Sequence, residues 1–517
     1  MKRAALVCAT ALTALAIPAV GSSAPGPKAP LIDDHAEYVP PGTHPGAAAR
    51  VPRGLDLRSD GGGAALLRKG KGGGRQLQTG FGDFLFVNED SDLRGEVMDE
   101  AAGMNGSIVR LYASWRRIAP VDPDGSFNAT DPGDPQYSWD YIDAAVEDAT
   151  KRGLTPMLMI TDAPDWAEGP HRPASAPPGT WKPNPKDVGD FAKAISRRYA
   201  GGFDGLPKVN DYMLWNEPNL PSNLTPQWKG KTPLSPDIYK GMLNAFYKSI
   251  HATSHKNKVI TAGTAPYGFP PGEYSMRPLT FWSNVLCVSD TEKPKAKKCK
   301  TKPDFDVLAH HPIDTSGGPT TAAIDRDDIS TPDLHRLVDV LRIAEKHHNV
   351  GTGGSHPVWA TELWWESNPP DHFKKNPSLA VQAQWYAQAL YLLWKQGAST
   401  VLFYQVRDDT HYGPTGVHTG SSYETGEYFV NGKPKPSAQA VRFPLVAQRV
   451  GKTKAVIWGI APESGKLVVT QQGQGAKKVA TFHAKPGGIF TKTVNLPGKH
   501  QVQASVGKSK SLKYPLR

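Results

Sequence analysis

Two glutamates interrupt apolar runs that otherwise have the character of buried strands. Glu217 follows "DYMLW" in the stretch "DYMLWNEPNL", and Glu362 lies inside "PVWATELWW". An unpaired carboxylate is costly to bury, so neither residue suits a protein core. Trp215 and Asn216 adjoin the first glutamate, and Trp364 the second. Paired carboxylates flanked by aromatic rings suit cleavage of a glycosidic bond, in which one acid protonates the leaving oxygen and the other attacks the sugar. Either glutamate alone also fits a structural role, as a helix cap or an ion-pair partner.

The two glutamates belong to a long alternation of strand-like and helix-like segments. Apolar, β-rich runs predict strands at residues 82–87, 107–115, 155–161, 211–215, 258–265, 304–312, 357–365 and 399–406. Amphipathic patterns predict helices at residues 92–105, 139–153, 187–201, 236–254, 333–348 and 379–397. Strands apolar on both faces indicate a parallel sheet covered by helices, and eight such units close naturally into a (β/α)8 TIM barrel, an α/β fold. A doubly wound open sheet is the rival, but the turn "VNEDSD" lacks the glycines of its nucleotide-binding forms.

Barrel geometry predicts that both glutamates lie at one site. Side chains at the C-terminal ends of barrel strands point into the mouth of the barrel, where active sites are built. Glu217 ends the fourth predicted strand and Glu362 ends the seventh. We therefore expect the two carboxylates to face each other across the mouth.

The chain divides into four predicted parts. Residues 1–24 combine a basic start, an apolar run and small residues, which is the layout of a secretory signal peptide, so we expect export. Residues 25–76 are rich in Pro, Gly and Ala and indicate a low-complexity leader. Residues 77–445 are the expected catalytic barrel, and the short β-like pieces of residues 446–517 predict a small C-terminal β-sandwich. No other apolar run approaches the ~20 residues of a membrane helix, so we expect no membrane span.

The positive charge of the chain is concentrated at its C-terminal end. Residues 451–517 contain twelve Lys and Arg and a single acid, Glu463, and their net charge equals the +11 of the whole chain. A basic module on an exported protein fits an acidic cell-wall polymer or polysaccharide. A solvated lysine surface that keeps the module soluble is the more ordinary interpretation. We expect no nucleic-acid partner.

Two cysteines lie close together in the lysine-rich insertion "LCVSDTEKPKAKKCK". They are Cys287 and Cys299. Exported proteins keep disulfides, so a bond that clips this loop is the preferred interpretation. A metal site is the alternative, but two thiols without a nearby His or further Cys make an incomplete ligand set. We expect a disulfide here, and neither a metal nor another cofactor in the protein.

Several motifs within residues 80–445 resemble the retaining glycoside hydrolases of clan A, most closely families 39, 5 and 51. They are "LWNEPN" at the end of strand four, "TEL" at the end of strand seven, "VRLYASWRRI" on strand two and "WDYIDAAVEDATKRGLTPMLMITDAPDWA" through strand three. The resemblance implies a barrel enzyme that cleaves O-glycosidic bonds of a polysaccharide or oligosaccharide with retention of configuration. It does not indicate which sugar.

The resemblance also implies a role for individual residues. Glu217 would be the general acid/base and Glu362 the nucleophile, with their carboxyl groups about 5–5.5 Å apart. Asn216 would hydrogen-bond the sugar hydroxyl beside the anomeric carbon, an interaction that strengthens in the transition state. Arg110, at the end of strand two, would pair with the nucleophile and keep it ionised.

Further sugar-binding residues are expected on strands six to eight. His311 matches the place where relatives carry a His or Tyr near the nucleophile; the alternatives are a structural histidine, or His310 as the inward one. Many clan members carry a Trp at the end of strand eight, whereas "VLFYQVRDD" offers Tyr404 and Gln405. We expect His311, Trp364 and Tyr404 to line the sugar site.

Two other functions compete with this interpretation. A non-catalytic carbohydrate-binding barrel would keep the aromatic residues and lose one carboxylate, but both carboxylates are present. A metal-dependent barrel hydrolase would use His310, His311 and the acids of "VRDDTHYG". The sequence contains no H-x-H or HExxH spacing that supports such a site.

Overall fold

The computed structural model of the chain describes residues 76–314, 317–370, 376–409, 423–473 and 476–516. The expected signal peptide and nearly all of the expected leader lie outside the described residues.

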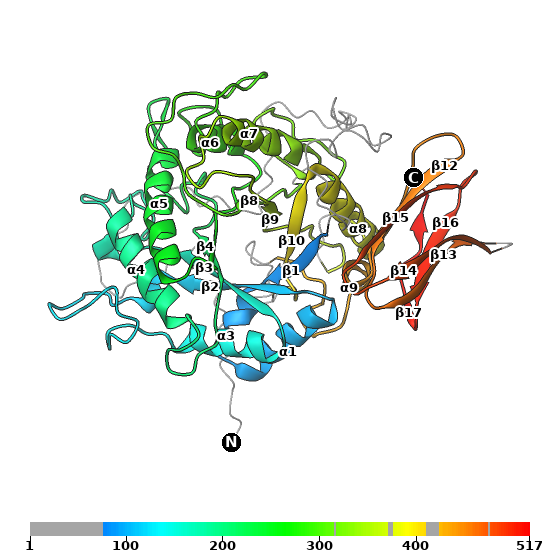
Figure 1. Cartoon of the computed structure of the whole chain (residues 1–517), viewed down its shortest axis with the longest axis horizontal. Coiled ribbons are helices and arrows are strands. Elements are labelled where there is room, and N and C mark those ends of the chain that lie inside the picture. Colours follow the sequence, from blue (N-terminus) through cyan, green and yellow to red (C-terminus); the bar gives the residue numbers. More distant parts are fainter. Residues whose placement is uncertain (1–75, 315–316, 371–375, 410–422, 474–475, 517) are drawn as a thin grey trace.

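Eight parallel strands form a barrel, as predicted (Figure 1). Its strands are β1 (Gln78–Gly82), β2 (Ile108–Ser114), β3 (Thr155–Thr161), β4 (Asp211–Leu214), β7 (Lys258–Ile260), β8 (Leu308–His310), β9 (Val358–Ala360) and β10 (Ala398–Tyr404). Hydrogen bonds join them in the order β7-β4-β3-β2-β1-β10-β9-β8. A parallel bridge between Ile260 and Val307 connects β7 with the start of β8, which closes the sheet on itself.

Helices surround this barrel (Figure 1). The longer ones are α1 (Ser91–Gly103), α3 (Asp140–Lys151), α4 (Pro185–Arg198), α5 (Ser235–Thr253), α6 (Pro278–Val285), α7 (Leu334–Lys346) and α8 (Leu379–Gln396). Their ends follow local chemistry: Asn184 accepts from the backbone N–H of Lys186 to cap α4, and Gly397 ends α8 in the left-handed conformation, with φ 111°. Among the described residues, no helix is both long enough and apolar enough to cross a bilayer.

Short elements complete the barrel. They are η1 (Phe84–Val87), α2 (Trp115–Ile118), η2 (Asp165–Ala167), β5 (Trp228–Lys229), β6 (Thr232–Pro233), η3 (Thr331–Asp333) and α9 (Pro436–Arg442).

Seven of the predicted strands are confirmed, and the first, at residues 82–87, is wrong. The strand lies earlier, in "QTGFG", and the apolar run that follows is the 3-10 helix η1. Asp83 starts that helix, because its carboxylate accepts from the backbone N–H of Leu85 at 2.8 Å. Gly80 is required in the strand, since a Cβ there would lie 2.3 Å from the carbonyl oxygen of Ile108. Glycine is uncommon inside strands, so the sequence pattern of "QTGFG" did not indicate a strand.

Two layers of apolar side chains hold the barrel together. The inner layer fills the barrel and consists of Ile108, Met157, Met159, Met213, Ile260, Val307, Ala309, Trp359 and Leu402. The outer layer lies between the strands and the helices. Neighbours along β10 show the alternation, since Leu402 belongs to the inner layer and Phe403 to the outer one. A filled interior gives the residues at the strand ends a rigid base.

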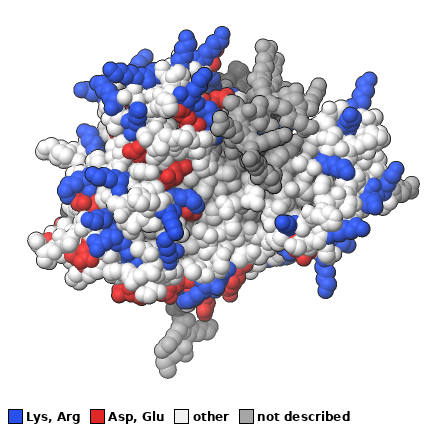
Figure 2. All heavy atoms as spheres, in the orientation of Figure 1, with Lys and Arg blue, Asp and Glu red and all other residues white. Residues whose placement is uncertain are grey.

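The C-terminal region forms the predicted β-sandwich. One sheet contains β11 (Leu445–Arg449), β12 (Lys454–Ile460) and β15 (Ile489–Asn495), and the other contains β14 (Lys477–Ala484), β13 (Gly465–Gln472), β16 (Gln501–Val506), β17 (Ser509–Lys510) and β18 (Tyr514–Pro515). The sandwich packs on α8, where the Trp458 ring lies 5.5 Å from Tyr391 and 5.8 Å from Trp394 between centroids. Lys and Arg side chains are scattered over its visible face, with little acidic surface among them (Figure 2).

The expected disulfide is present. Cys287 and Cys299 are bonded across the segment after α6, with their Cα atoms 5.4 Å apart. The bond clips a loop that lies beside α6, a helix the sequence pattern did not reveal.

Candidate active site

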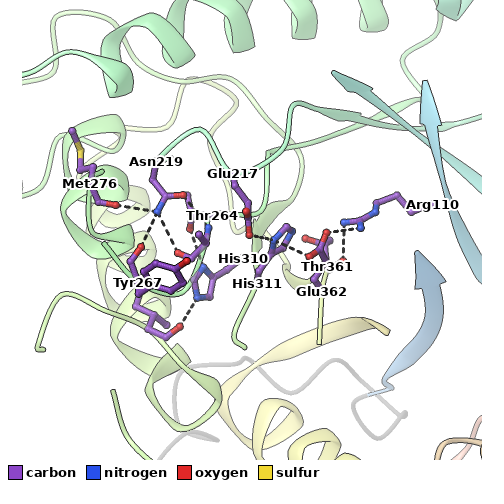
Figure 3. Close-up of polar contacts among 12 residues, drawn as sticks. Arg110, Glu217, Asn219, Thr264, Tyr267, Met276, His310, His311, Thr361 and Glu362 are labelled. Atoms are coloured by element: carbon purple, nitrogen blue, oxygen red, sulfur yellow. Dashed lines mark hydrogen bonds and ion pairs between the residues drawn. The ribbon is translucent and has the colours of Figure 1, made fainter. Parts of the chain in front are cut away.

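The two glutamates meet at the mouth of the barrel. Glu217 follows β4 and Glu362 follows β9, so both lie at the carboxyl ends of parallel strands. One carboxylate oxygen of each, together with a ring nitrogen of His311, lie within 4.8 Å of one another. Figure 3 shows these side chains converging, with Arg110 beyond Glu362. The structure thus brings together four residues that the sequence suggested.

His311 lies between the two carboxylates. Its Nδ1 is 2.8 Å from Glu217 Oε1 and 3.5 Å from Glu362 Oε2. Glu362 is ionised and can only accept a hydrogen bond, and Nδ1 faces it as well as Oε1 of Glu217, so Nδ1 carries the proton and donates it. The ring is fully buried, and Nε2 has no hydrogen-bond partner among the described residues. His311, rather than His310, is therefore the histidine that faces the carboxylates.

His310 points the other way and is a buried structural residue. Its Nε2 donates to the carbonyl oxygen of Ile329 at 2.8 Å. Its Nδ1 accepts from the hydroxyl of Thr264 at 2.9 Å, and that hydroxyl accepts from Nε1 of Trp282 at 3.0 Å. Burial lowers the pKa of His310 to about 3, so the ring is neutral and its tautomer is fixed by these partners.

Arg110 holds the carboxylate of Glu362. Its Nη2 donates to Glu362 Oε1 at 2.5 Å and to the hydroxyl of Tyr112 at 2.6 Å, and its Nη1 donates to the carbonyl oxygen of Thr361 at 3.0 Å. Burial acts to raise the pKa of Glu362, but the charges of His311 and Arg110 outweigh it, and the net pKa lies below the ordinary value. Glu362 is therefore held as an anion, which suits a nucleophile.

The backbone at Glu217 is held in an unusual conformation. Glu217 has φ 35° and Trp215 has φ 73°, in the left-handed region that non-glycine residues adopt at a cost of about 1–3 kcal/mol. Hydrogen bonds fix the turn, since Glu217 donates its N–H to the Gly263 carbonyl at 2.9 Å and Trp215 donates to that of Ile160 at 2.8 Å. Such strain is commonly found at functional sites.

Asn216 offers an unused acceptor beside Glu217. Its side-chain oxygen is buried and has no hydrogen-bond partner among the described residues. A buried acceptor without a partner is costly, and a hydroxyl group of a ligand could satisfy it.

Aromatic side chains form a connected group beside Arg110, whose Nη2 donates to the hydroxyl of Tyr112. The ring of Tyr423 contacts those of Tyr404 and Trp364, each with centroids 5.7 Å apart. Phe84 stacks on Tyr112 at 4.1 Å and meets the Tyr404 ring edge-on at 6.3 Å. Tyr404 and Trp364 therefore belong to one aromatic wall, and their role in binding a sugar stays a prediction.

Three residues of this wall were not identified from the sequence. Tyr112 could have been, because it lies two residues after Arg110 on the same strand and therefore on the same face. Phe84 belonged to the misplaced first strand, and Tyr423 reaches the mouth from a loop without any sequence signal.

Within the described part of the chain, Glu217, His311 and Glu362 form the one group that could hold a metal ion. The positive groups already beside the two carboxylates make a metal site unfavourable. Arg110 already neutralises Glu362, and the proton of His311 Nδ1 lies between the carboxylates where a cation would bind. The arrangement suits proton transfer and nucleophilic attack better than metal ligation.

Comparisons with known proteins support the fold. No family model and no curated protein matches the sequence. A family 39 glycoside hydrolase from the gut symbiont Bacteroides cellulosilyticus WH2 has a similar structure, with a TM-score of 0.51 and 14% identity over 81% of each chain. A glucosidase from Croceicoccus marinus has a TM-score of 0.47 and 14% identity, over 82% of this chain and 81% of that one. At such identities, the first likeness shows a shared barrel fold alone.

Proposed function

We propose that this chain is a retaining glycoside hydrolase that cleaves O-glycosidic bonds of an oligosaccharide or polysaccharide. The observation that carries the proposal is the pair of glutamates from β4 and β9, with oxygens within 4.8 Å of each other. Retaining enzymes keep their two carboxyl groups about 5–5.5 Å apart, whereas inverting enzymes separate them by about 6.5–9.5 Å to admit a water. The short separation supports a double displacement.

Glu362 suits the role of nucleophile. Arg110 and His311 lower its pKa, so it is ionised and can attack the anomeric carbon to form a glycosyl-enzyme ester. Glu217 suits the role of acid/base, because its carboxyl group lies opposite Glu362 and can carry a proton on Oε2 while Oε1 accepts from His311 Nδ1. Glu217 gives its proton to the leaving oxygen. Once Glu217 has given up this proton, its carboxylate can take a proton from the water that attacks the glycosyl-enzyme.

The remaining residues bind the sugar in this proposal. The unpaired side-chain oxygen of Asn216 accepts from the hydroxyl next to the anomeric carbon. Tyr404 and Trp364, in the aromatic wall, offer apolar faces to the sugar ring.

The non-catalytic carbohydrate-binding barrel remains the alternative. A binding protein has no need to keep a buried carboxylate ionised with an arginine, because desolvating such a pair costs free energy. The Arg110–Glu362 pair therefore favours the enzyme.

The proposal extends to location and to the C-terminal module. Residues 1–24 have the layout of a signal peptide, so we place the mature protein outside the cell. All eleven lysines between residues 452 and 513 are exposed, and none forms an ion pair with another described residue. Such a uniformly cationic surface supports binding to an acidic polymer.

Hydrolysis of a panel of aryl glycosides tests the proposed function. The wild-type protein should release the aryl alcohol from at least one sugar of the panel, at a rate that a chelator does not change. Glu362→Ala is the matched inactive variant, and Glu217→Ala should turn over only slowly. Sugar binding by calorimetry without any turnover across the panel would instead favour the non-catalytic barrel.

A further inference from the structure

The segment that follows β7 has no role in the mechanism above, yet it contacts both the turn that carries Glu217 and the two histidines at the end of β8. It comprises Gly263, Thr264 and Ala265, and it lies between the turn that carries Glu217 and the end of β8 (Figure 3).

The segment is joined to the turn of Glu217 by two sets of hydrogen bonds. The carbonyl oxygen of Gly263 accepts from the backbone N–H of Glu217 at 2.9 Å. Ala265 donates its N–H to the side-chain oxygen of Asn219 at 2.9 Å. The side-chain amide of Asn219, which is fully buried, donates to the carbonyl oxygens of Met276 at 3.0 Å and Ala265 at 3.3 Å. The turn therefore cannot shift without breaking buried bonds, each worth about 1 kcal/mol or more.

The same segment fixes the two histidines. The carbonyl oxygen of Thr264 accepts from the backbone N–H of His311 at 3.1 Å. Its hydroxyl accepts from Nε1 of Trp282 and donates to Nδ1 of His310. The indole N–H can only donate, so the direction of both hydrogen bonds is fixed. Thr264 thus sets the position of the chain from which the ring of His311 extends.

Gly263 leaves the space that the His311 ring fills. A Cβ on Gly263 would lie 2.1 Å from Nε2 and Cδ2 of His311 and 2.7 Å from the hydroxyl oxygen of Thr361. Contacts this short are not tolerated, so any other residue here would displace the ring. The ring has little freedom to move, because its other side faces the two glutamates.

We propose that Gly263 and Thr264 are positioning residues that set the contact between His311 Nδ1 and Glu217. In this proposal Gly263 and Thr264 act through the side chains of His311 and Glu217 and make no contact of their own with the substrate. The kinetic test of this inference rests on the proposed glycosidase function, whereas its spectroscopic test does not.

A double-mutant cycle tests the role of Gly263. In Gly263→Ala the added methyl group should push the His311 ring away from Glu217 and lower kcat about 10²-fold, the effect of a misplacement near 1 Å. In a His311→Ala background the ring is absent, so the same substitution should change kcat by less than about 2-fold. Equal losses in both backgrounds would overturn the inference, because Gly263 would then act independently of His311.

Thr264 is tested by a matched pair of variants. Thr264→Ser keeps the hydroxyl and should retain activity, whereas Thr264→Val removes it. If Thr264 positions the acid/base, Thr264→Val should slow substrates with poor leaving groups more than those with good ones, since only the former need the proton of Glu217. A loss of equal size on every leaving group would indicate a general folding defect and contradict the positioning role.

A measurement without substrate separates this inference from the proposed function. In protein labelled with ¹⁵N-histidine, the His311 ring resonances are assigned by their absence in His311→Ala. They should shift strongly in Gly263→Ala and in Glu217→Gln, and remain in place in Thr264→Ser. An unchanged His311 ring in Gly263→Ala would refute the positioning role even if no glycoside were ever hydrolysed.

Discussion

The barrel mouth and the C-terminal sandwich use charge in opposite ways. In the mouth the polar groups are buried or nearly so, and each has a partner: the Arg110 guanidinium pairs with the Glu362 carboxylate, and Nδ1 of His311 hydrogen-bonds Glu217. On the sandwich all eleven described lysines are exposed, and the single acid, Glu463, accepts from the backbone N–H of Ser509. The two regions thus differ in what surrounds each charge, water or protein.

That difference determines what each charge can do. In a buried site a neighbouring charge is weakly screened and shifts a pKa, as Arg110 and His311 do for Glu362. At the surface, water and salt screen each lysine within about 8–10 Å, so many of them act together as an attractive surface. Substitutions in the mouth should therefore change the rate of glycoside hydrolysis. Substitutions of the sandwich lysines should change only binding to an acidic polymer.

The largest effect is expected from loss of Glu362, the proposed nucleophile. Glu362→Ala should lower kcat by at least about 10⁴-fold on every substrate, because no covalent intermediate can form. Initial rates on aryl glycosides with good and poor leaving groups measure this. Substantial activity on any of them would show that Glu362 is not the nucleophile.

Loss of the buried cation should appear in the pH profile. Arg110 lowers the pKa of Glu362, so its removal in Arg110→Leu should raise that pKa and leave less of the anion in acid. The acidic limb of kcat/KM should move to higher pH, by about 1–3 units. Arg110→Lys, which keeps the charge, is the control and should move it less. An unmoved limb in Arg110→Leu would mean that the arginine does not control ionisation of the nucleophile.

A smaller effect on stability is expected at the rim of the barrel. Asp83 accepts from the backbone N–H groups of Leu85 at 2.8 Å, Val406 at 2.9 Å and Arg407 at 3.2 Å, which ties β1 to the loop after β10. In Asp83→Asn the new NH₂ group must face one of these donors, so the free energy of unfolding should fall by about 1–3 kcal/mol. Urea denaturation measures this change. Equal stability of the two proteins would show that these bonds matter little.

The smallest effect on turnover is expected from the sandwich. A variant with Gln at Lys477, Lys478, Lys485 and Lys492 should hydrolyse a small aryl glycoside within about 2-fold of the wild-type rate, because exposed charges far from the mouth are screened. It should bind immobilised polygalacturonate more weakly than the wild type. A barrel variant with the same change at four exposed lysines is the control, at Lys193, Lys208, Lys256 and Lys346.

Two results would contradict the role given to the sandwich. Equal retention of both lysine variants on polygalacturonate would show that its charge is only a solvated surface. Equal binding of the wild type to a neutral glucan and to polygalacturonate would show that charge does not select the partner.

Most of the barrel could be predicted from the sequence because its strands are short apolar runs between amphipathic helices. The first strand could not, since Gly80 and Gly82 in "QTGFG" remove the apolar signal where the backbone approaches Ile108. The helix α6 was also missed, because its eight residues are too few to show a clear period.

Some residues of the candidate site could be predicted from the sequence, and others could not. Glu217 and Glu362 were identifiable because each interrupts or follows an apolar run, and Arg110 and His311 were found through the family resemblance. The expectation that Arg110 ends its strand was wrong, since it is the third residue of β2 and points inward to Glu362 from there. Gly263 and Asn219 were not identifiable, because their importance lies in contacts between loops far apart in the chain, such as the space that Gly263 leaves for His311. No pattern within one segment carries that information.

The central claim is that Glu217 is the acid/base and Glu362 the nucleophile of a retaining enzyme, and azide rescue tests it most directly. Glu217→Ala should form the glycosyl-enzyme from a substrate with a good leaving group and then wait on a slow second step. Added azide should enter the space left by the carboxylate, restore turnover and yield a glycosyl azide of retained configuration, as read from the anomeric proton by NMR. A glycosyl azide of inverted configuration from Glu217→Ala would show that Glu217 is the nucleophile and contradict the assignment.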